Sequence, residues 1–358
     1  MISDVHTSGN PSEDTEQFLI AGLCDMKKAI PDSIALVNTG DFTKRSSKEQ
    51  YESFFQILGQ YGPEPSKVVN ALGNHDVRGG DVSTWNKDET KEGAYWSTAK
   101  ELYLTNNRPY MPDTNGRTYF DKWLGGYHFI VLNTERAIKD AMYLSEEQLQ
   151  WLEKTLAEDA AEEKPIFVLG HNGLNDTHWR SNILNGFGLT DGKVKEIFSK
   201  YPQVIYLSGH IHNGFGVAEV IDREFGCMVE IPSFNESENG DTSHGTGWVA
   251  EVSSDKIQLK ARNFKDSKWL PEYDVEIPLP SLPVVYQKAK KLYAQGMSCP
   301  NLPALLEEAC ALLHRQYDQS VIEAWDDVRP PAKSLYNQEV RKRICIVAKE
   351  LKRCIDSQ

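Results

Sequence analysis

The stretch VIYLSGHIHN, residues 204–213, joins a strand pattern to two candidate metal ligands. Its first four residues are valine, isoleucine, tyrosine and leucine, a mixture that favours a buried β-strand. Gly209 ends the apolar run, and His210 and His212 follow one residue apart. Side chains two positions apart in an extended chain lie on the same side, and imidazole is the commonest metal ligand. An isolated pair of this kind is more often structural, so the rest of the chain has to decide.

The composition narrows the class of protein. The chain has 358 residues, of which 40% are hydrophobic and 25% charged, as is ordinary for a soluble globular protein. Its formal net charge of −13 argues against a nucleic-acid polymer or an anionic membrane surface as the main partner. The six cysteines form no C-x-x-C pair, so we expect reduced thiols and a cytoplasmic location. An export signal lost ahead of Met1 stays open as the alternative.

Short apolar runs alternate with helical patterns in the first 215 residues. Strands are predicted over residues 33–39, 67–72, 127–133, 165–170 and 203–209. Helices are predicted over 13–30, over 46–60 and from residue 145 onward. Ser46 with Glu49, and Ser145 with Gln148, stand at the spacing of a capping box at the start of two of these helices. Helices between strands indicate a layered α/β domain.

The pattern changes after residue 215. Residues 227–234, 245–254 and 256–264 predict three successive strands of a second, more antiparallel sheet. Residues 78–117 are polar and aromatic and predict an irregular insertion, which at a strand end usually serves function. Prolines near residue 280 mark a boundary between a catalytic domain over 1–280 and a helical appendage over 285–358. We expect the apolar stripe of that appendage to pack on the main domain or on a second subunit, as in a homodimer.

Polar side chains follow four of the predicted strands and the short segment Met1–Ser3, at the point where each ends. Loops at the carboxyl ends of strands converge in an open α/β sheet, and glycine lets the chain turn sharply there. The residues so placed include seven candidate ligands with oxygen or nitrogen and no sulfur: Asp4, His6, Asp41, Asn74, His171, His210 and His212. Seven such ligands suit two Mn, Fe or Zn ions that share one bridging carboxylate. Two such ions activate a shared water and stabilise an in-line phosphoryl displacement.

The motifs SDVH, TGDF, GNHD, LGH and GHIH occur in this order between residues 3 and 212. In this respect the chain resembles the calcineurin-like metallophosphoesterases, whose motif set is D-x-H, G-D, G-N-H-D, G-H and G-H-x-H. The resemblance implies a four-layer α/β/β/α sandwich with two mixed sheets, extending to about residue 275 and leaving the helical tail outside. The chain departs from the family in having only Met1, Ile2 and Ser3 ahead of the first motif.

The resemblance also implies a role for each matching residue. Asp4, His6 and His212 would hold one metal, Asn74, His171 and His210 the other, and Asp41 would bridge them. His75 would protonate or stabilise the leaving oxygen, and Asp76 would orient the His75 imidazole. A hydroxide that bridges the metals would attack phosphorus.

Four further residues are candidates for substrate contact: Arg78, Asn172, His178 and His244. The aromatic insertion and the lack of an obvious basic cluster slightly favour phosphodiesters, including cyclic nucleotides, over phosphomonoesters. In either case the expected partner is a small phosphate ester. A non-catalytic scaffold on the same fold is the alternative of a different class.

Overall fold

The computed structural model describes residues 1–158, 164–317 and 338–358. Its largest sheet has six strands in the order β3 (Phe120–Leu124), β4 (Tyr127–Val131), β5 (Ile166–Leu169), β6 (Val204–Ser208), β8 (Gly226–Glu230) and β7 (Val220–Arg223). The four central strands run parallel, and β3 and β7 pair antiparallel at the two edges. Residues 227–234 therefore do not join the second sheet as predicted, because β8 pairs in parallel with β6.

The second sheet is assembled from two groups of strands. β9 (Thr246–Val252), β10 (Lys256–Asn263), β11 (Lys268–Trp269) and β12 (Val275–Pro278) pair antiparallel, whereas β1 (Leu36–Asn38) and β2 (Val68–Asn70) pair in parallel. The first residues of the chain join the groups. The Ile2 amide donates to the Val37 carbonyl at 2.9 Å, and the Met1 nitrogen donates to the Trp248 carbonyl at 2.8 Å.

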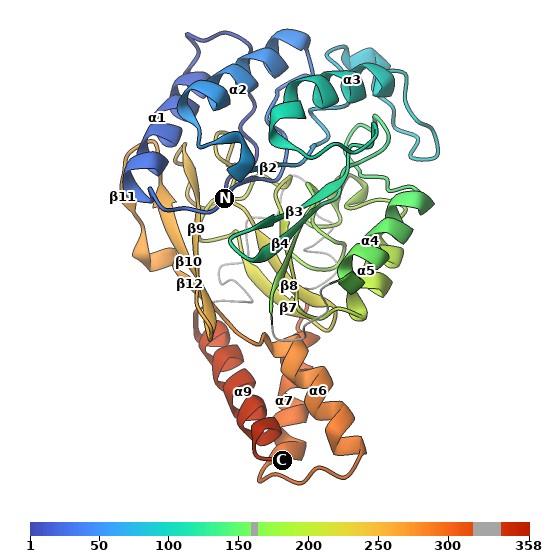
Figure 1. The fold of residues 1–358 in the computed structure, drawn as a ribbon, viewed down its shortest axis with the longest axis vertical. Helices are drawn as coiled ribbons and strands as arrows, with labels where there is room; N and C mark the ends of the chain where they lie inside the picture. Colours follow the sequence, from blue (N-terminus) through green and yellow to red (C-terminus); the bar gives the residue numbers. More distant parts are fainter. Residues whose placement is uncertain (159–163, 318–337) are drawn as a thin grey trace.

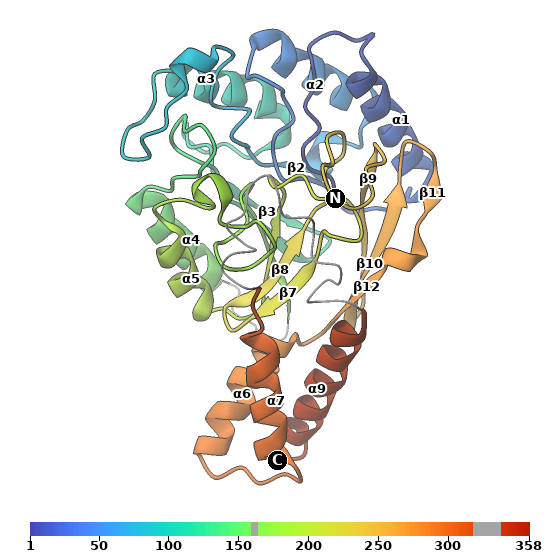
Figure 2. The same cartoon turned by 180° about the vertical axis from the view of Figure 1, so that it is seen from behind.

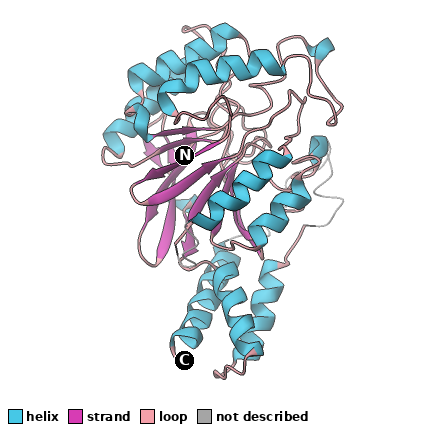
Figure 3. Cartoon of the chain, turned by 45° about the vertical axis from the view of Figure 1, so that its right-hand side comes forward, coloured by secondary structure: helices cyan, strands magenta, loops and turns pink. Residues whose placement is uncertain are grey.

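Helices cover the outer faces of both sheets (Figures 1 and 3). α1 (Asp14–Ala29), α2 (Lys48–Tyr61) and α3 (Trp96–Asn107) pack on the second sheet, and α4 (Glu146–Glu158) and α5 (Asp191–Ser199) pack on the six-stranded sheet. A third apolar core, which includes Phe129, Phe167 and Trp248, lies between the sheets. Short 3₁₀ turns occur at η1 (Pro65–Lys67), η2 (Val82–Thr84), η3 (Arg108–Tyr110), η4 (Ile183–Asn185) and η5 (Pro271–Tyr273). The predicted four-layer sandwich is confirmed.

Local details depart from the sequence patterns in two places. The N-cap of α2 is Ser47, whose hydroxyl accepts from the Gln50 amide, while the Ser46 hydroxyl donates to the His75 carbonyl instead. Residues 78–117 are irregular only in part, since they contain α3. Buried Trp96, Ala99 and Tyr103 hold that helix against the rest of the domain.

Three C-terminal helices project from one end of the sandwich: α6 (Leu282–Ala294), α7 (Leu302–Leu313) and α9 (Gln338–Asp356) (Figure 2). The stripe of α9 packs within the chain, with Ile344, Val347 and Leu351 fully buried in the core that also holds α4 and α5. The predicted helical appendage is thus present, while its use as a dimer contact stays a prediction. Among the described helices, none combines the length and low polarity needed to span a bilayer.

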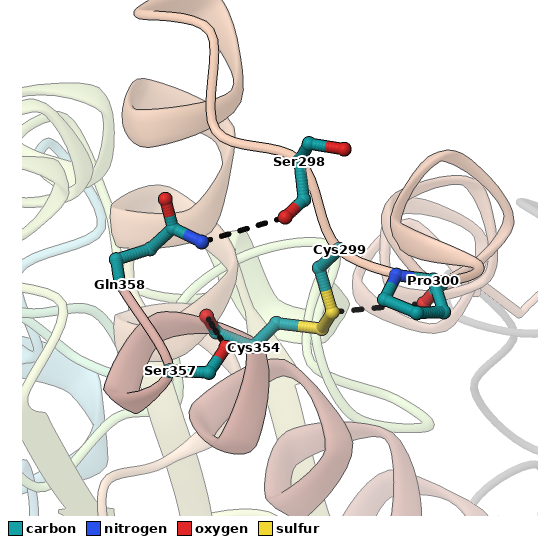
Figure 4. The surroundings of a disulfide bond; sticks show 6 residues. All are labelled: Ser298, Cys299, Pro300, Cys354, Ser357 and Gln358. Carbon is teal, nitrogen blue, oxygen red and sulfur yellow. Dashed lines mark hydrogen bonds between the residues drawn. A yellow bond between two sulfur atoms is a disulfide. The ribbon is translucent and has the colours of Figure 1, made fainter.

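A disulfide joins Cys299, in the loop before α7, to Cys354 near the end of α9 (Figure 4). Cys24, Cys227, Cys310 and Cys345 are free thiols. The expectation of six reduced cysteines was wrong because this pair is 55 residues apart in sequence and only the helix packing brings it together. The disulfide links the loop between α6 and α7 to the last turns of α9.

Candidate metal centre

The predicted ligands stand on loops of unusual backbone geometry. Asp4, His6, Asp41, His210 and His212 all have positive φ angles, between 50° and 77°. Non-glycine residues rarely adopt this region, and each such residue costs on the order of 1–3 kcal/mol. Five of them at the ends of adjacent strands indicate that the surrounding structure holds these side chains in place for function.

Neighbouring backbone fixes the first loop on both sides. The Asp4 amide donates to the Gly40 carbonyl at 3.1 Å, and the His6 amide donates to the Asp41 carbonyl at 2.9 Å. On the other side, the Asn235 amide donates to the Asp4 carbonyl at 3.3 Å. Asp4 and His6 are both fully buried. The short first segment therefore positions its ligands firmly.

Four of the predicted ligands form one cluster. The nearest ligand atoms of Asp4, His6, Asp41 and His212 lie within 4.8 Å of one another. His212 Nε2 is 3.3 Å from Asp4 Oδ1 and 3.1 Å from His6 Nε2. The two imidazole nitrogens form a hydrogen bond, and the four ligand atoms converge as the ligands of one cation would.

The remaining ligands lie on the other side of Asp41. His171 Nε2 is 3.1 Å from Asp41 Oδ2, and His210 Nδ1 is 3.1 Å from Asn74 Oδ1. The rings of His171 and His210 meet edge to face, with centroids 5.1 Å apart. Asp41 Oδ2 lies 4.0 Å from His6 Nε2 as well, so this carboxylate stands between the two groups as a bridging ligand would, while Asp4 Oδ1 lies 3.8 Å from His171 Nε2. The structure brings all seven residues together, and their individual ligand roles stay predictions.

The hydrogen bonding of the buried ligand atoms shows whether this cluster fits a metal. Asp4 Oδ1, Asp41 Oδ2, His171 Nε2 and His210 Nε2 are buried and form no well-aligned hydrogen bond, although Asp41 Oδ2 and His171 Nε2 face each other at 3.1 Å and Asp4 Oδ1 lies 3.3 Å from His212 Nε2. An unsatisfied buried polar atom costs about 1–3 kcal/mol, more if it is charged, so four in one place need an explanation. Burial raises the pKa of Asp41, but the charges of His171 and His75 outweigh burial and hold it well below its usual range. An ionised carboxylate with converging imidazole nitrogens fits bound cations.

Hydrogen bonds to backbone carbonyls fix the orientation of two of the predicted ligands, His171 and Asn74. His171 Nδ1 lies 3.0 Å from the Thr39 carbonyl, which leaves Nε2 directed at Asp41. The Asn74 amide nitrogen donates to the Lys139 carbonyl at 2.9 Å, which leaves its oxygen directed at His210. Such partners set the tautomer of a histidine ligand and the rotation of an amide. No sequence pattern indicated Thr39 or Lys139, because both act through their backbone carbonyls.

Three of the four glycines in the motifs are needed because neighbouring atoms leave no room for a side chain, and not because the backbone makes the expected sharp turn. Only Gly40 has a positive φ, of 112°. A Cβ at Gly73 would lie 2.0 Å from Asp41 Oδ1, and one at Gly209 would lie 1.9 Å from Ser3 Oγ. A Cβ at Gly170 would lie 2.3 Å from the Tyr206 hydroxyl. The strand ends are packed so tightly around the carboxylates that no side chain fits.

His75 occupies its expected place, but Asp76 does not orient it. His75 Nδ1 lies 2.8 Å from the Lys44 carbonyl, and Nε2 lies 3.9 Å from Asp41 Oδ2. The Asp76 carboxylate instead accepts from the Thr43 amide and the Gly73 amide, each at 2.8 Å, and from the Thr43 hydroxyl at 2.7 Å. Burial, with the nearby charge of Asp41, raises the pKa of Asp76 to about 7. The prediction for Asp76 is corrected: it ties two ligand loops together.

A pocket of about 250 Å³ opens over the centre. Beyond the ligands and His75, its lining comprises three basic, two acidic and four apolar residues: Arg78, Lys139, Arg180, Asp140, Glu238, Trp85, Ile183, Leu184 and Ile211. Arg78 lies on one wall, 3.2 Å from Asp140 and with its guanidinium 4.1 Å from the Trp85 ring centroid. It also contacts the His75 ring. Arg78 therefore lines the pocket, and its contact with a substrate stays a prediction.

The other three residues proposed to contact substrate are elsewhere. The Asn172 amide is buried and donates to the Asp140 and Gly186 carbonyls at 2.8 and 2.9 Å. His178 is 1% exposed, and burial lowers its pKa to about 3. His244 is exposed but stacks on Phe18, with ring centroids 5.1 Å apart. None of the three lines the pocket, so these predictions are corrected: position just after a motif did not imply access to the site.

Comparison with known proteins agrees with this geometry. A dimetal phosphatase from Danio rerio matches with a TM-score of 0.56 and 12% identity, over 77% of this chain and 97% of that one. A purple acid phosphatase from yellow lupin (Lupinus luteus) seeds matches with a TM-score of 0.52 and 14% identity, over 77% of this chain and 52% of that one. At these identities the likeness shows the fold.

The curated proteins contain no match to this chain. The sequence model of the calcineurin-like phosphoesterases matches residues 1–214, which include all seven predicted ligands. The chain therefore belongs to the calcineurin-like phosphoesterase family, a hydrolase family that acts on phosphate esters.

Proposed function

We propose that the chain is a metal-dependent phosphatase that hydrolyses small phosphomonoesters. The observation that carries the proposal is the juxtaposition of the seven-residue ligand cluster with three basic side chains, Arg78, Lys139 and Arg180, in one pocket. The sequence seemed to lack a basic cluster, and the slight preference for diesters depended on that. These three residues are far apart along the chain, and the fold assembles them at the mouth of the site.

The charges suit a dianionic phosphate group. Asp140 lies 2.7 Å from Lys139 Nζ and 3.2 Å from Arg78, and Glu238 lies 3.0 Å from Arg180. Each acid holds a basic side chain against the pocket wall, where charge-assisted hydrogen bonds to phosphate oxygens are strongest. The Danio rerio protein with a similar fold is also described as a dimetal phosphatase. These points support a monoester over a diester.

Two bound ions, which we propose to be Mn, Fe or Zn, would supply an activated water and stabilise charge on the phosphoryl oxygens. The residues of the chain bind and orient the substrate. Arg78 would hold a phosphate oxygen, and its contact with His75 would keep that ring beside the substrate. His75 Nε2 is the ring nitrogen that faces the pocket, because Nδ1 lies against the Lys44 carbonyl; in its imidazolium form the ring would give the Nε2 proton to the leaving oxygen and become neutral.

A phosphodiesterase is the second candidate. Trp85 lines the pocket on the Arg78 side, and Ile183 and Leu184 also line it. An aromatic and two aliphatic walls would suit the second ester group of a diester. We propose a small phosphate ester as partner in both cases, and no nucleic-acid polymer.

The cytoplasmic location was expected because all six cysteines were predicted to be reduced, and two of them are not. Cys299 and Cys354 form a disulfide, and disulfides persist mainly in oxidising compartments. We propose such a compartment in place of the cytoplasm. Fractionation of the native host with an antibody against the chain would decide between them.

The test is hydrolysis of p-nitrophenyl phosphate and bis-p-nitrophenyl phosphate side by side with added Mn²⁺. We expect faster turnover of the monoester, and loss of both activities in Asn74→Ala and His75→Ala. Arg78→Ala should reduce monoester turnover more than diester turnover, because a dianion gains more from the guanidinium. Faster diester turnover would favour the second candidate. A folded chain that binds no metal and hydrolyses neither ester would instead support the scaffold.

A further inference from the structure

Four apolar side chains line the pocket over the ligand cluster: Trp85, Ile183, Leu184 and Ile211. None of the apolar cores formed by the described residues includes any of the four. Ile183 and Ile211 are buried, whereas Trp85 and Leu184 are half-buried. These side chains are therefore placed against the pocket and not in the interior of the domain, so their apolar surface is available to a bound molecule.

Leu184 is held in a backbone conformation that leucine rarely adopts. Its φ is 52°, and that of Gly186, two residues on, is 54°. The turn is fixed by the Gly186 amide, which donates to the Ile183 carbonyl at 2.8 Å, and by the Asn175 side-chain oxygen, which accepts from the Phe187 amide at 2.8 Å. Asparagine or glycine would suit this φ better, and residues strained in this way gather at ligand sites. The leucine side chain at this position is therefore a candidate for ligand contact.

Trp85 offers only carbon atoms to a ligand. Its indole nitrogen donates to the Gly79 carbonyl at 2.8 Å, and the Arg78 guanidinium lies 4.1 Å from its ring centroid. Ile183 and Leu184 have no polar side-chain atom. A hydroxyl group of a bound molecule would lose its water against these three side chains and gain no hydrogen bond from them, which is unfavourable. This part of the pocket therefore favours an apolar group.

The basic and the apolar residues of the pocket suit the two parts of a phosphomonoester. Arg78, Lys139 and Arg180 provide positive charge for the phosphate. A phosphomonoester has only one organic group, which is the alcohol that leaves. The apolar side chains would contact that alcohol.

We propose that the substrate is the phosphomonoester of an apolar alcohol, branched alkyl or aryl, and that Leu184 is a residue that selects it. This inference rests on the proposed phosphatase activity and narrows its substrate class. Sugar phosphates, nucleotides and glycerol phosphate should be poor substrates, because their hydroxyl groups near the ester oxygen would face Leu184 and Ile183. Recognition of the apolar group can be measured without hydrolysis, so the two proposals can fail separately.

Calorimetry of the Mn²⁺-loaded protein with phenylphosphonate and methylphosphonate measures recognition alone, because neither compound contains an ester bond. Phenylphosphonate should bind at least about tenfold more tightly, since even one methylene in an apolar pocket changes selectivity by about 10-fold or more. Equal affinities, or no binding of either compound, would overturn the proposal.

Hydrolysis of isopentyl phosphate and glycerol phosphate tests the same preference in the reaction. Both are esters of alcohols, and glycerol is the more acidic alcohol, so faster turnover of the isopentyl ester cannot come from a better leaving group. Its kcat/KM should be at least about tenfold higher. Equal or faster turnover of glycerol phosphate would overturn the proposal. If neither ester is hydrolysed but phenylphosphonate still binds more tightly, the phosphatase activity is refuted and recognition of the apolar group is supported.

Leu184→Asn tests the role of the leucine and should fold. Asparagine has a similar size and tolerates the left-handed backbone, so Tm should stay the same or rise. The affinity for phenylphosphonate should fall about tenfold, while that for methylphosphonate stays within about threefold. Leu189→Asn is the matched control, because Leu189 lies in the same loop, is 60% exposed and is outside the pocket lining. An unchanged preference in Leu184→Asn, or an equal loss in Leu189→Asn, would overturn the role of Leu184.

Discussion

Gly73→Ala should disable the site through a single methyl group. A Cβ at this position would lie 2.0 Å from Asp41 Oδ1 and 2.4 Å from the Asp41 amide nitrogen. Since real Cβ contacts essentially never fall below 3.0 Å, the carboxylate must move by at least 3.0 − 2.0 = 1.0 Å. The backbone contact requires a further shift of at least 3.0 − 2.4 = 0.6 Å, which rotation of the Asp41 side chain cannot relieve.

That displacement acts on a carboxylate that stands between the two ligand groups. It would also break the bond in which the His75 amide donates to Asp41 Oδ1 at 2.8 Å. A misplacement of about 1 Å in a catalytic site can lower the rate about 100-fold, equivalent to about 2.7 kcal/mol. We therefore expect kcat/KM for p-nitrophenyl phosphate to fall at least about 100-fold, together with the number of bound metal ions.

The assay combines steady-state kinetics with metal content by mass spectrometry and a thermal melt. Gly192→Ala is the matched control, because its Cβ meets nothing within 4 Å and it lies in α5. That substitution should leave kinetics and metal content unchanged and stabilise the helix slightly, by up to about 1 kcal/mol. A Gly73→Ala protein with two metals and kcat/KM within about threefold of wild type would refute the reasoning. The metal measurement holds even if p-nitrophenyl phosphate is a poor substrate.

Four further predictions test other features. Asp76→Asn should lower Tm by at least about 4 °C, because the Thr43 amide, the Thr43 hydroxyl and the Gly73 amide lose their carboxylate acceptor. If Asp76 instead orients His75, the substitution would lower kcat and leave Tm unchanged. Asn172→Ala should also lower Tm but change KM by less than about threefold, since its amide serves two backbone carbonyls; a large rise in KM would restore it as a substrate contact. Chelation by EDTA should abolish hydrolysis and lower Tm by several degrees, because a ligand at about 100 times its Kd stabilises the folded state by about 2.7 kcal/mol. Added Mn²⁺ should reverse both effects. An unchanged Tm in EDTA would contradict a metal at this site. Alkylation of the denatured, unreduced protein should modify four cysteines, and six after reduction; six in both would show that Cys299 and Cys354 are unpaired.

The sequence by itself determined the α/β class and which polar residues meet at the edge of the sheet. Buried parallel strands require runs such as residues 204–208, and parallel strands bring their carboxyl ends to one edge of the sheet. Polar residues placed directly after those runs, such as His171 and His210, had therefore to meet. This inference needs only strand periodicity and chain direction, both of which are local properties of the sequence.

Tertiary structure decided what surrounds the ligands. The family resemblance implied that Asp76 orients His75, but the loops place the Asp76 carboxylate between Thr43 and Gly73. Asn172 and His178 follow a ligand closely and are nonetheless buried. Which way a side chain leaves a loop depends on backbone angles and neighbours that the sequence does not display.

The same reason explains what the sequence concealed. The pocket brings together Arg78, Lys139 and Arg180 from three separate loops. Acidic residues pair with these side chains, so no run of positive charge stands out in the sequence. Backbone carbonyls that orient ligands, such as that of Lys139, carry no residue signature at all. The disulfide between Cys299 and Cys354 likewise joins segments distant in the chain. Local patterns specify the elements and their ends, whereas the contacts between loops arise only when the layers pack.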